Sequence, residues 1–270
     1  MDLHTIDQVL IPVERSGLPS GRPDTAVIAG GTWLMSEKQH HLTRLVDITG
    51  LHWTPLIADD DGLEIAATCT IECLAGTLFE RDWPATVLFR QCAEALLASF
   101  KIWSVATVGV NICLALPAGA MISLTTALDA VALVWNPDGT DYRVPVVDLV
   151  TGPNENALRV GDVVRSIHLP AQALASRTAF RKIALSPLGR SASVVIGRID
   201  SDGQFVLSVT AATVRPYVLR FTEPPSGDDL SEALAEQIPS DAWYDDPHGA
   251  PDWRRHISLT SAREILEELR

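Results

Sequence analysis

Two adjacent glycines, Gly30 and Gly31, follow a strand-like apolar run and constrain the fold of this chain more than any other feature. The run from Thr25 to Ala29 predicts a buried β-strand. The glycines remove two Cβ atoms at the turn, which permits positive φ and a close approach of the backbone to a ligand. Thr32 adds a hydroxyl and an N–H at the start of a helix predicted over residues 33–41, where unpaired N–H groups favour an anion. The stretch is typical of a pyrophosphate cradle, and it is also typical of a plain structural turn.

A strand predicted at 44–48 completes a small β-α-β unit around this turn. The turn then lies at the carboxyl end of its strand, where open α/β units place ligands. The Gly-x-Gly-x-x-Gly pattern of the common dinucleotide-binding fold is absent from the turn.

The rest of the chain divides by its hydrophobic patterning into a mixed middle part and a later part with longer strands. Thr70 is predicted to cap a helix, and Pro137-Asp138-Gly139 predicts the turn of a hairpin. The predicted strands of the middle part are 63–67, 132–135, 142–146 and 162–170, and its longer helices are 85–100 and 121–130. From about residue 171 we expect an antiparallel meander at 179–184, 193–199 and 205–211, then helices at 230–238 and 253–270. The turn at His248, with Arg254 shortly after it, is predicted to connect two elements and to pack against the last helix.

Charge and composition exclude several classes of protein. The 270 residues carry a net charge of −13, which argues against a nucleic-acid binder and against a polybasic membrane anchor. No apolar run reaches the roughly 18 residues of a membrane span, and the first residues do not resemble a signal peptide, so the expected compartment is the cytoplasm. The four cysteines, Cys69, Cys73, Cys92 and Cys113, do not form a zinc or iron–sulfur ligand set, and we expect buried reduced thiols.

A second glycine-bearing stretch, Ala106 to Asn111, changes the interpretation of the first. Ala29 to Leu34 matches the motif Ala-Gly-Gly-Thr-x-Leu, and Ala106 to Asn111 matches most of Ala-Thr-Ile-Gly-Gly-Asn. Pro117 and Leu128-Asp129-Ala130 continue the second motif. With these motifs in this order the chain resembles, over essentially its whole length, the FAD-binding medium subunits of molybdenum hydroxylases. That family includes the medium subunit of carbon monoxide dehydrogenase and the flavin domain of xanthine dehydrogenase.

The resemblance implies an α+β fold in three parts. Residues 1–50 and 51–170 would be two α/β FAD-binding subdomains, and residues 171–270 a smaller domain with an antiparallel sheet and helices. It also implies that FAD lies in the cleft between the first two parts, held by one loop from each.

The resemblance assigns the diphosphate of FAD to the first loop, where two phosphates need inward N–H groups and little side-chain bulk. In the second loop a hydroxyl and an amide would satisfy phosphate and ribityl oxygens, with Gly109 permitting a tight turn. Val164 would lie beside the flavin ring, and Lys182 would be a cation that stabilises an anionic reduced flavin. Without the resemblance, Val164 is typical of ordinary core and Lys182 of a solvated strand. The candidate cofactor-binding residues are Ala29, Gly30, Gly31, Thr32, Trp33, Thr107, Gly109, Val110, Asn111, Pro117, Ala120, Val164 and Lys182.

Three positions depart from the family pattern. Val110 replaces the second glycine of the second motif, and this would cost about 1–2 kcal/mol if the site needs positive φ. If the site instead needs a close approach, the isopropyl group would crowd the cofactor. Ala120 stands where the family commonly has an aspartate, and Trp103-Ser104 where it has Arg-Asn.

The resemblance predicts a flavoprotein electron-transfer subunit. FAD would take electrons from iron–sulfur clusters of a partner subunit and pass them to an acceptor such as NAD, while a molybdenum-cofactor subunit hydroxylates the substrate. The departures around the cleft motivate an alternative, a stand-alone enzyme on the same scaffold that acts on a small organic molecule in secondary metabolism. That enzyme would use flavin for oxidation or would use the former flavin cleft for a non-redox cyclisation or rearrangement.

Overall fold

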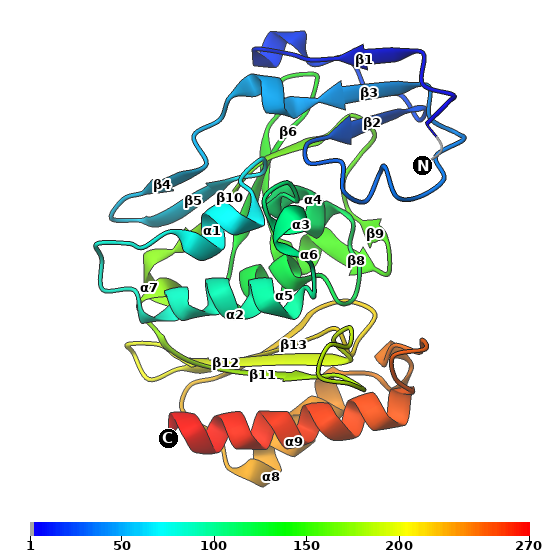
Figure 1. Ribbon diagram of the computed structural model, residues 1–270. Coiled ribbons are helices and arrows are strands. Elements are labelled where there is room, and N and C mark those ends of the chain that lie inside the picture. The colour runs from blue at the N-terminus through cyan, green and yellow to red at the C-terminus, as the bar shows by residue number, and fades with distance from the viewer. Residues whose placement is uncertain (1–2) are drawn as a thin grey trace.

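A computed structural model describes residues 3–270 and shows three tiers of mixed helix and sheet (Figure 1). A small N-terminal sheet lies at one end, a central sheet with most of the short helices lies in the middle, and a C-terminal sheet with two helices lies at the other end. Each sheet falls within one of the three predicted parts, and the division into parts at residues 50 and 170 remains a prediction. No helix within residues 3–270 has the length and hydropathy needed to cross a membrane.

The N-terminal sheet consists of three short parallel strands in the order β1 (Gln8–Leu10), β3 (Arg44–Asp47) and β2 (Thr25–Ile28). The strands predicted at 25–29 and 44–48 are therefore confirmed. Ala26 pairs with Leu45 and Val27 with Val46, so successive residues face opposite sides of the sheet. The Leu45 side packs into a small core with Ile28 and Leu42, and the other side faces the central tier.

The helix predicted over residues 33–41 is wrong, because this segment folds as a series of turns. Its backbone hydrogen bonds are few and local, from Met35 to Gly31 and from Ser36 and Glu37 to Trp33. The segment from Ser36 to Gln39 is polar and largely exposed, so a helix here would have no apolar face to bury, and short helices need such a face. Thr32 consequently does not lie at a helix N-terminus.

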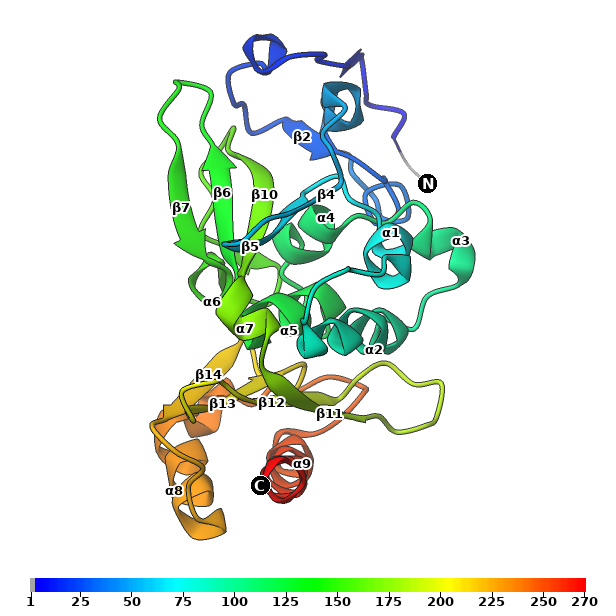
Figure 2. The ribbon, with the colours of Figure 1, turned by 90° about the vertical axis from the view of Figure 1, so that its left-hand side faces the viewer.

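The central sheet is a five-stranded antiparallel sheet in the order β4-β5-β10-β6-β7, with its helices gathered on one side (Figure 2). Its strands are β4 (Leu56–Ala58), β5 (Gly62–Ala66), β10 (Val163–Pro170), β6 (Val131–Trp135) and β7 (Tyr142–Pro145). The predicted hairpin and the strands at 63–67 and 162–170 are confirmed, whereas β4 was not predicted. A two-stranded sheet, β8 (Val150–Gly152) with β9 (Glu155–Asn156), lies beside it.

The helices of this tier cover the largest hydrophobic core of the molecule. They are α1 (Ile71–Gly76), α2 (Val87–Ala95), α3 (Phe100–Trp103), α4 (Val108–Cys113), α5 (Ala120–Ala127), α6 (Val146–Leu149) and α7 (Ala171–Leu174). Thr70 caps α1 as predicted, since its hydroxyl accepts a hydrogen bond from the Cys73 N–H at 3.1 Å. The helix predicted to run to residue 100 ends at Ala95, because the chain turns at Leu97 with φ of 54°.

The C-terminal sheet is an antiparallel meander of β11 (Arg177–Ile183), β12 (Ser193–Ile199), β13 (Phe205–Thr210) and β14 (Tyr217–Phe221). The first three strands confirm the predicted meander, and β14 is an addition. One face packs against α2 and α5, and the other against α8 (Gly227–Gln237) and α9 (Pro251–Leu269), as Figure 2 shows. The sheet is therefore covered on both sides.

Two buried arginines tie this end of the molecule together. Arg254, with 1% of its surface exposed, donates to the carbonyl oxygens of Gly249, Ala192 and Ala211 and to the Asp246 carboxylate. This confirms that the turn before α9 packs the last helix. Arg198 bonds Asp200, the residue after its own strand, and also the carbonyl oxygen of Ala127, the last residue of α5, and Asp129 just beyond that helix. The C-terminal sheet is thus bonded to the central tier as well as packed on it.

Candidate functional site

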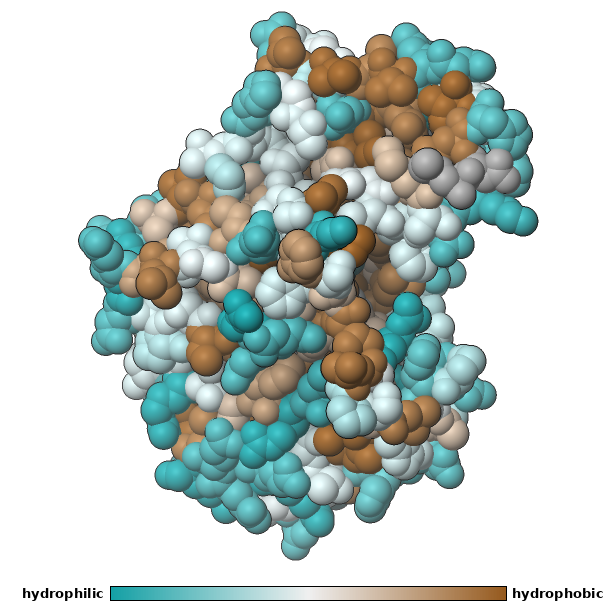
Figure 3. Space-filling view, in the orientation of Figure 1, coloured by the Kyte–Doolittle hydropathy of each residue, from teal (hydrophilic) through white to brown (hydrophobic). Residues whose placement is uncertain are grey.

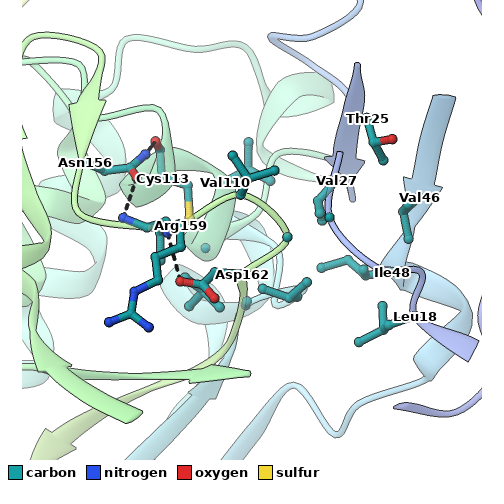
Figure 4. A pocket seen from close by; sticks show the side chains of 18 of the residues that line it. Leu18, Thr25, Val27, Val46, Ile48, Val110, Cys113, Asn156, Arg159 and Asp162 are labelled. Carbon is teal, nitrogen blue, oxygen red and sulfur yellow. Dashed lines mark hydrogen bonds between the residues drawn. The ribbon is translucent and has the colours of Figure 1, made fainter. Parts of the chain in front are cut away.

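A cavity of about 370 Å³ lies between the N-terminal sheet and the central tier (Figure 4). One wall is the face of β2 and β3 that carries Thr25, Val27 and Val46. The opposite wall carries Val110 from α4 and Val164 from β10. The strand alternation therefore builds one side of a cleft that is mainly apolar.

The two glycine-bearing stretches meet next to this cavity, although they lie far apart in the sequence. A Cβ atom on Gly30 would lie 1.9 Å from the carbonyl oxygen of Val105, so only glycine fits there. Gly31 has φ of 68°, the positive value that the sequence predicts for this turn. The first stretch thus packs backbone to backbone against the segment that leads into the second.

Gly109 is required for packing, and the prediction of a tight turn at this residue is wrong. It lies inside α4, where a Cβ atom would come within 2.5 Å of the Ala67 Cβ and 2.8 Å of the Ala67 carbonyl oxygen. Its N–H donates to that same oxygen at 3.0 Å. The glycine therefore lets α4 lie directly on the end of β5.

Val110 carries no backbone strain. It is a residue of α4 and is absent from the residues of positive φ found in the described chain, so the strain considered for this position does not arise. Its side chain lies in the wall of the cavity, on the opposite side from Val27 (Figure 4). Two effects of Val110 were considered from the sequence, backbone strain and crowding of the cofactor. The structure excludes the strain, and the crowding remains a prediction.

Two threonine hydroxyls are buried and lack a hydrogen-bond partner within the described chain. One is Oγ1 of Thr25, which lines the cavity, and the other is Oγ1 of Thr107, which is 3% exposed, lines neither cavity and lies two residues before Gly109 of the cavity wall. Thr107 precedes α4 but gives no side-chain cap, whereas Thr70, its bridge partner, caps α1. A buried polar group without a partner is costly. A polar ligand that donates to or accepts from these hydroxyls would relieve that cost.

Asn111 bonds the protein itself with one of its two side-chain atoms. Its Oδ1 accepts a hydrogen bond from the Met121 N–H at 2.9 Å and so serves the first turn of α5, whose N-cap, Gly119, has no side chain. Asn111 and Pro117 line a second cavity of about 90 Å³, together with Arg190 from the C-terminal tier. Since Val110 lines the first cavity, α4 contributes to both cavities.

The other predicted residues are placed as follows. Trp33 lines the first cavity, but Ala29, Gly30, Gly31, Thr32 and Thr107 do not. Ala120 begins α5, is 2% exposed and lines neither cavity. Lys182 also lines neither, and it lies on β11 next to Arg181, which pairs with Glu264 and Glu268 of α9.

Sequence reasoning missed the residues that build the cavity from the N-terminal sheet and from the segment before β10. These are Leu18, Thr25, Val27, Val46, Ile48, Arg159 and Asp162, all labelled in Figure 4. The alternation of β2 and β3 was a usable signal for the strand residues, because every second side chain must face away from the Leu45 side. No local signal marks Arg159 or Asp162.

The four cysteines are reduced, as predicted. Cys113 lines the first cavity, and burial raises the pKa of its thiol to about 12, so the thiol is protonated at neutral pH. Burial likewise raises the pKa of Cys69 and Cys92. Within residues 3–270, no three His, Cys, Asp or Glu side chains gather in a way that could hold a metal ion.

Comparison with known proteins shows the family and the fold. A family model described as the FAD binding domain in molybdopterin dehydrogenase matches residues 6–172, more than half of the chain. The putative xanthine dehydrogenase FAD-binding subunit of Escherichia coli (strain K12) is 24% identical over 277 residues, spanning 93% of this chain and 90% of that protein. In a crystal structure of the Cu,Mo-CO dehydrogenase, a chain 19% identical in sequence superposes with a TM-score of 0.80 and 97% coverage of both chains. A chain of quinoline 2-oxidoreductase from Pseudomonas putida 86, 16% identical, gives a TM-score of 0.79 with 99% and 98% coverage. These structures share the fold, which confirms the predicted α+β class.

Proposed function

Since the chain belongs to the family of FAD-binding domains of molybdopterin dehydrogenases, with FAD as its cofactor, we propose that it is the electron-transferring flavoprotein subunit of a molybdenum hydroxylase. One observation carries the proposal. The two stretches that resemble the family's FAD loops, around Gly30 and Thr107, come together at the edge of a cavity between two tiers. A cleft formed by two parts of a chain is where cofactors are commonly bound.

The residues of the cleft fit such a cofactor. The diphosphate would lie against the first loop, as the resemblance implies, although the protein itself fills the space beside Gly30 and Gly31 and neither glycine lines a cavity. The unpaired hydroxyls of Thr25 and Thr107 would bond polar atoms of the cofactor, and Val27 with the side chains around it would exclude water from its apolar parts. When bound, FAD supplies an isoalloxazine ring that accepts and releases electrons.

In this proposal the cofactor extends along α4. Val110 and Val164 would contact the part in the larger cavity, and Asn111 and Pro117 the part that reaches the smaller one. The amide nitrogen Nδ2 of Asn111 would donate a hydrogen bond to the cofactor, because Oδ1 already accepts one from the Met121 N–H. Lys182 would act on the cofactor only through an intervening group, since it lines neither cavity.

The partners and the acceptor belong to the proposal as well. Iron–sulfur clusters and the molybdenum cofactor would lie in partner subunits, and the electrons would leave to an acceptor such as NAD. The proposal is supported by relatives that are FAD-binding subunits and by solved structures of molybdenum enzymes with the same fold.

A stand-alone enzyme has less support. Acid–base chemistry in the cleft would need a titratable side chain with free lone pairs or protons. Among the described residues that line the larger cavity, the one carboxylate is Asp162, and it already accepts three hydrogen bonds. We therefore keep the flavoprotein proposal alone.

The deciding experiment is a titration of the purified chain with FAD, followed by flavin fluorescence, together with the visible spectrum of the protein as isolated. We expect one FAD per chain. A protein that is colourless and also fails to bind added FAD would overturn the proposal.

Two matched threonine variants sharpen this test. Thr107→Val removes a hydroxyl that is buried and unpaired, so we expect weaker FAD binding but an unchanged or increased free energy of unfolding, by up to about 1 kcal/mol. Thr70→Val removes a helix cap from the bridge partner, so we expect a loss of about 1 kcal/mol in stability and unchanged FAD affinity. Equal effects of the two variants on FAD binding would count against a cofactor contact at Thr107.

A further inference from the structure

One wall of the larger cavity, here called the outer wall, is built from two short segments. It forms where residues 17–23 of the N-terminal tier meet residues 158–162 of the central tier. Val160 lines the cavity and exposes 63% of its surface.

The two segments touch through glycine. A Cβ atom on Gly21 would lie 2.4 Å from the Gly161 Cα and 2.5 Å from the Val160 carbonyl oxygen, and Gly161 has φ of 93°. At this point the two segments meet through their backbones, and two glycines contribute few dispersion contacts. Leu18, at the start of the outer segment, adds a side-chain contact, because it packs in one cluster with Val46, Ile48 and Val163.

Asp162 anchors the inner segment firmly. Its buried carboxylate accepts hydrogen bonds from Asn136 Nδ2 and the Tyr142 hydroxyl, both at 2.6 Å, and from the Arg159 N–H at 2.8 Å. Burial, followed by the bond to this carboxylate, raises the pKa of Tyr142 to about 12, so the hydroxyl stays a donor at neutral pH. The inner segment is thus fixed to the β6–β7 hairpin.

Arg15, which lies just before residues 17–23, bonds the same hairpin. Its guanidinium donates to Asp141 with two nitrogens, Nη1 at 2.9 Å, and Nη2 also donates to the Asn136 carbonyl oxygen at 3.4 Å. It also lies over the Trp135 ring, 4.7 Å from the centroid. Asn136 thereby accepts from Arg15 with its carbonyl and donates to Asp162 with its side chain.

We propose that residues 17–23 form a gate that moves away from residues 158–162 to admit and release FAD. The ion pair between Arg15 and Asp141, here called the clasp, holds this gate closed. The inference rests on the proposed function, because the gate serves a cofactor that occupies the cavity. The backbone contact between Gly30 and Val105 would stay in place while the gate opens, because it adjoins the buried start of α4. A bound dinucleotide is mostly enclosed, so its exchange requires that one wall move.

The test compares Arg15→Ala and Asp141→Asn with the unchanged chain by the rate at which bound FAD dissociates. Arg15→Ala removes the ion pair, the bond to the Asn136 carbonyl oxygen and the contact with the Trp135 ring, so we expect it to raise the dissociation rate constant about fivefold. Asp141→Asn removes the ion pair alone and should raise the rate constant less, with the double variant no faster than Arg15→Ala. Arg15→Lys, which keeps the charge, should fall between Arg15→Ala and the unchanged chain.

Arg181→Ala is the matched control, because Arg181 also pairs with two carboxylate oxygens and is similarly exposed, at 31% against 36% for Arg15. It should leave the release of FAD unchanged. Equal acceleration by Arg181→Ala and Arg15→Ala would overturn the gate, since it would show general loosening.

Hydrogen–deuterium exchange without FAD separates this inference from the proposed function. In Arg15→Ala we expect faster exchange in residues 17–23 and unchanged exchange in the C-terminal sheet. If the unchanged chain fails to bind FAD, the proposed function falls, and the exchange rates still decide whether Arg15 holds the wall closed. Unchanged exchange in residues 17–23 would overturn the clasp in either case.

Discussion

The N-terminal and C-terminal sheets differ in strand length, in the helices that cover them and in the buried hydrogen bonds around them. The N-terminal sheet has three strands of three or four residues and a core centred on Ile28, Leu42 and Leu45. Apolar surface gathers over this end of the molecule in Figure 3, and β1 with the residues after it leaves Val9 56% and Val13 75% exposed. The C-terminal sheet has longer strands, helices on both faces and two buried arginines that bond several carbonyls and carboxylates.

In the proposed function, the cofactor cleft lies between the N-terminal sheet with its small core and the central tier with its larger core. Binding loops and moving elements are drawn from the less stable parts of a fold, because they must open at low cost. The C-terminal and central tiers would then set the stability of the whole chain, while the N-terminal tier sets access to the cleft.

The largest effect should come from Arg254→Ala. The substitution leaves the carbonyls of Ala192 and Ala211 and the Asp246 carboxylate without their buried donor, and we expect a loss of about 4 kcal/mol in the free energy of unfolding. Denaturant titration measures it. Arg255→Ala, the exposed neighbour on α9, should change stability by less than about 0.5 kcal/mol. Similar losses in the two variants would contradict the rigid role given to the C-terminal tier.

Asp129→Asn tests the joint between the central and C-terminal tiers. Burial raises the pKa of Asp129, but hydrogen bonds from Arg220 and Arg198 outweigh it and hold the pKa below its usual range. A lowered carboxyl pKa stabilises the fold above the unfolded value of about 4, and the contribution is lost as the pH falls below it. We expect the variant to lose about 3 kcal/mol at pH 7 and to show a shallower decline in stability below pH 4.

Asp228→Asn is the control for that joint, since Asp228 is fully exposed and its nearest Arg263 nitrogen is 3.6 Å away. Its stability should match the unchanged chain at every pH. If Asp129→Asn kept the full acid-dependent loss, another carboxylate would have to be its source.

Gly30→Ala should weaken the binding of FAD near the N-terminal tier and leave the C-terminal tier unchanged. The added methyl would overlap the Val105 carbonyl, so the first loop must shift, and we expect FAD affinity to fall at least about tenfold, or 1.4 kcal/mol. Near-UV circular dichroism and unfolding of the C-terminal tier should change little. Gly76→Ala, at a glycine with no atom within 4 Å of its added Cβ, should leave FAD affinity unchanged. If Gly30→Ala binds FAD with unchanged affinity, the contact between Gly30 and Val105 is not part of the cofactor site.

The smallest effect should come from Val110. Val110→Ala shortens a side chain in the cavity wall and keeps a good helix former in α4, so we expect FAD to bind about threefold more tightly if the isopropyl group crowds the cleft. Val110→Gly should show a similar gain in affinity together with a loss of about 1 kcal/mol in stability. Weaker binding in both variants would mean that Val110 contacts the cofactor favourably.

Much of the fold could be predicted because its signals are local. Alternation gave β10 and the meander, Asp138-Gly139 gave the hairpin, and Thr70 gave the start of α1. The helix over residues 33–41 failed because a short polar segment becomes helical only when tertiary packing supplies a partner face. The edge strands β4 and β14 were missed because three to five residues carry too little pattern.

The candidate site was predictable in outline and unpredictable in detail. The two glycine stretches marked the family and the cleft, but Gly109 proved to be a packing glycine and Val110 a strain-free helical residue. The Arg15 clasp joins residues 126 positions apart, and Asp162 bonds side chains 20 and 26 positions away, so a short window of sequence contains neither set of contacts.

The sequence by itself determined the α+β class, the family and the two stretches that point to FAD, because strand alternation, turn chemistry and glycine pairs act over a few neighbouring residues. The tertiary structure alone decided which side chains line the cleft, which threonine hydroxyls lack a partner and which side chain holds the outer wall. Those properties depend on distances between segments that the chain brings together only when it folds, and a hydrogen bond or a buried contact exists only at such distances.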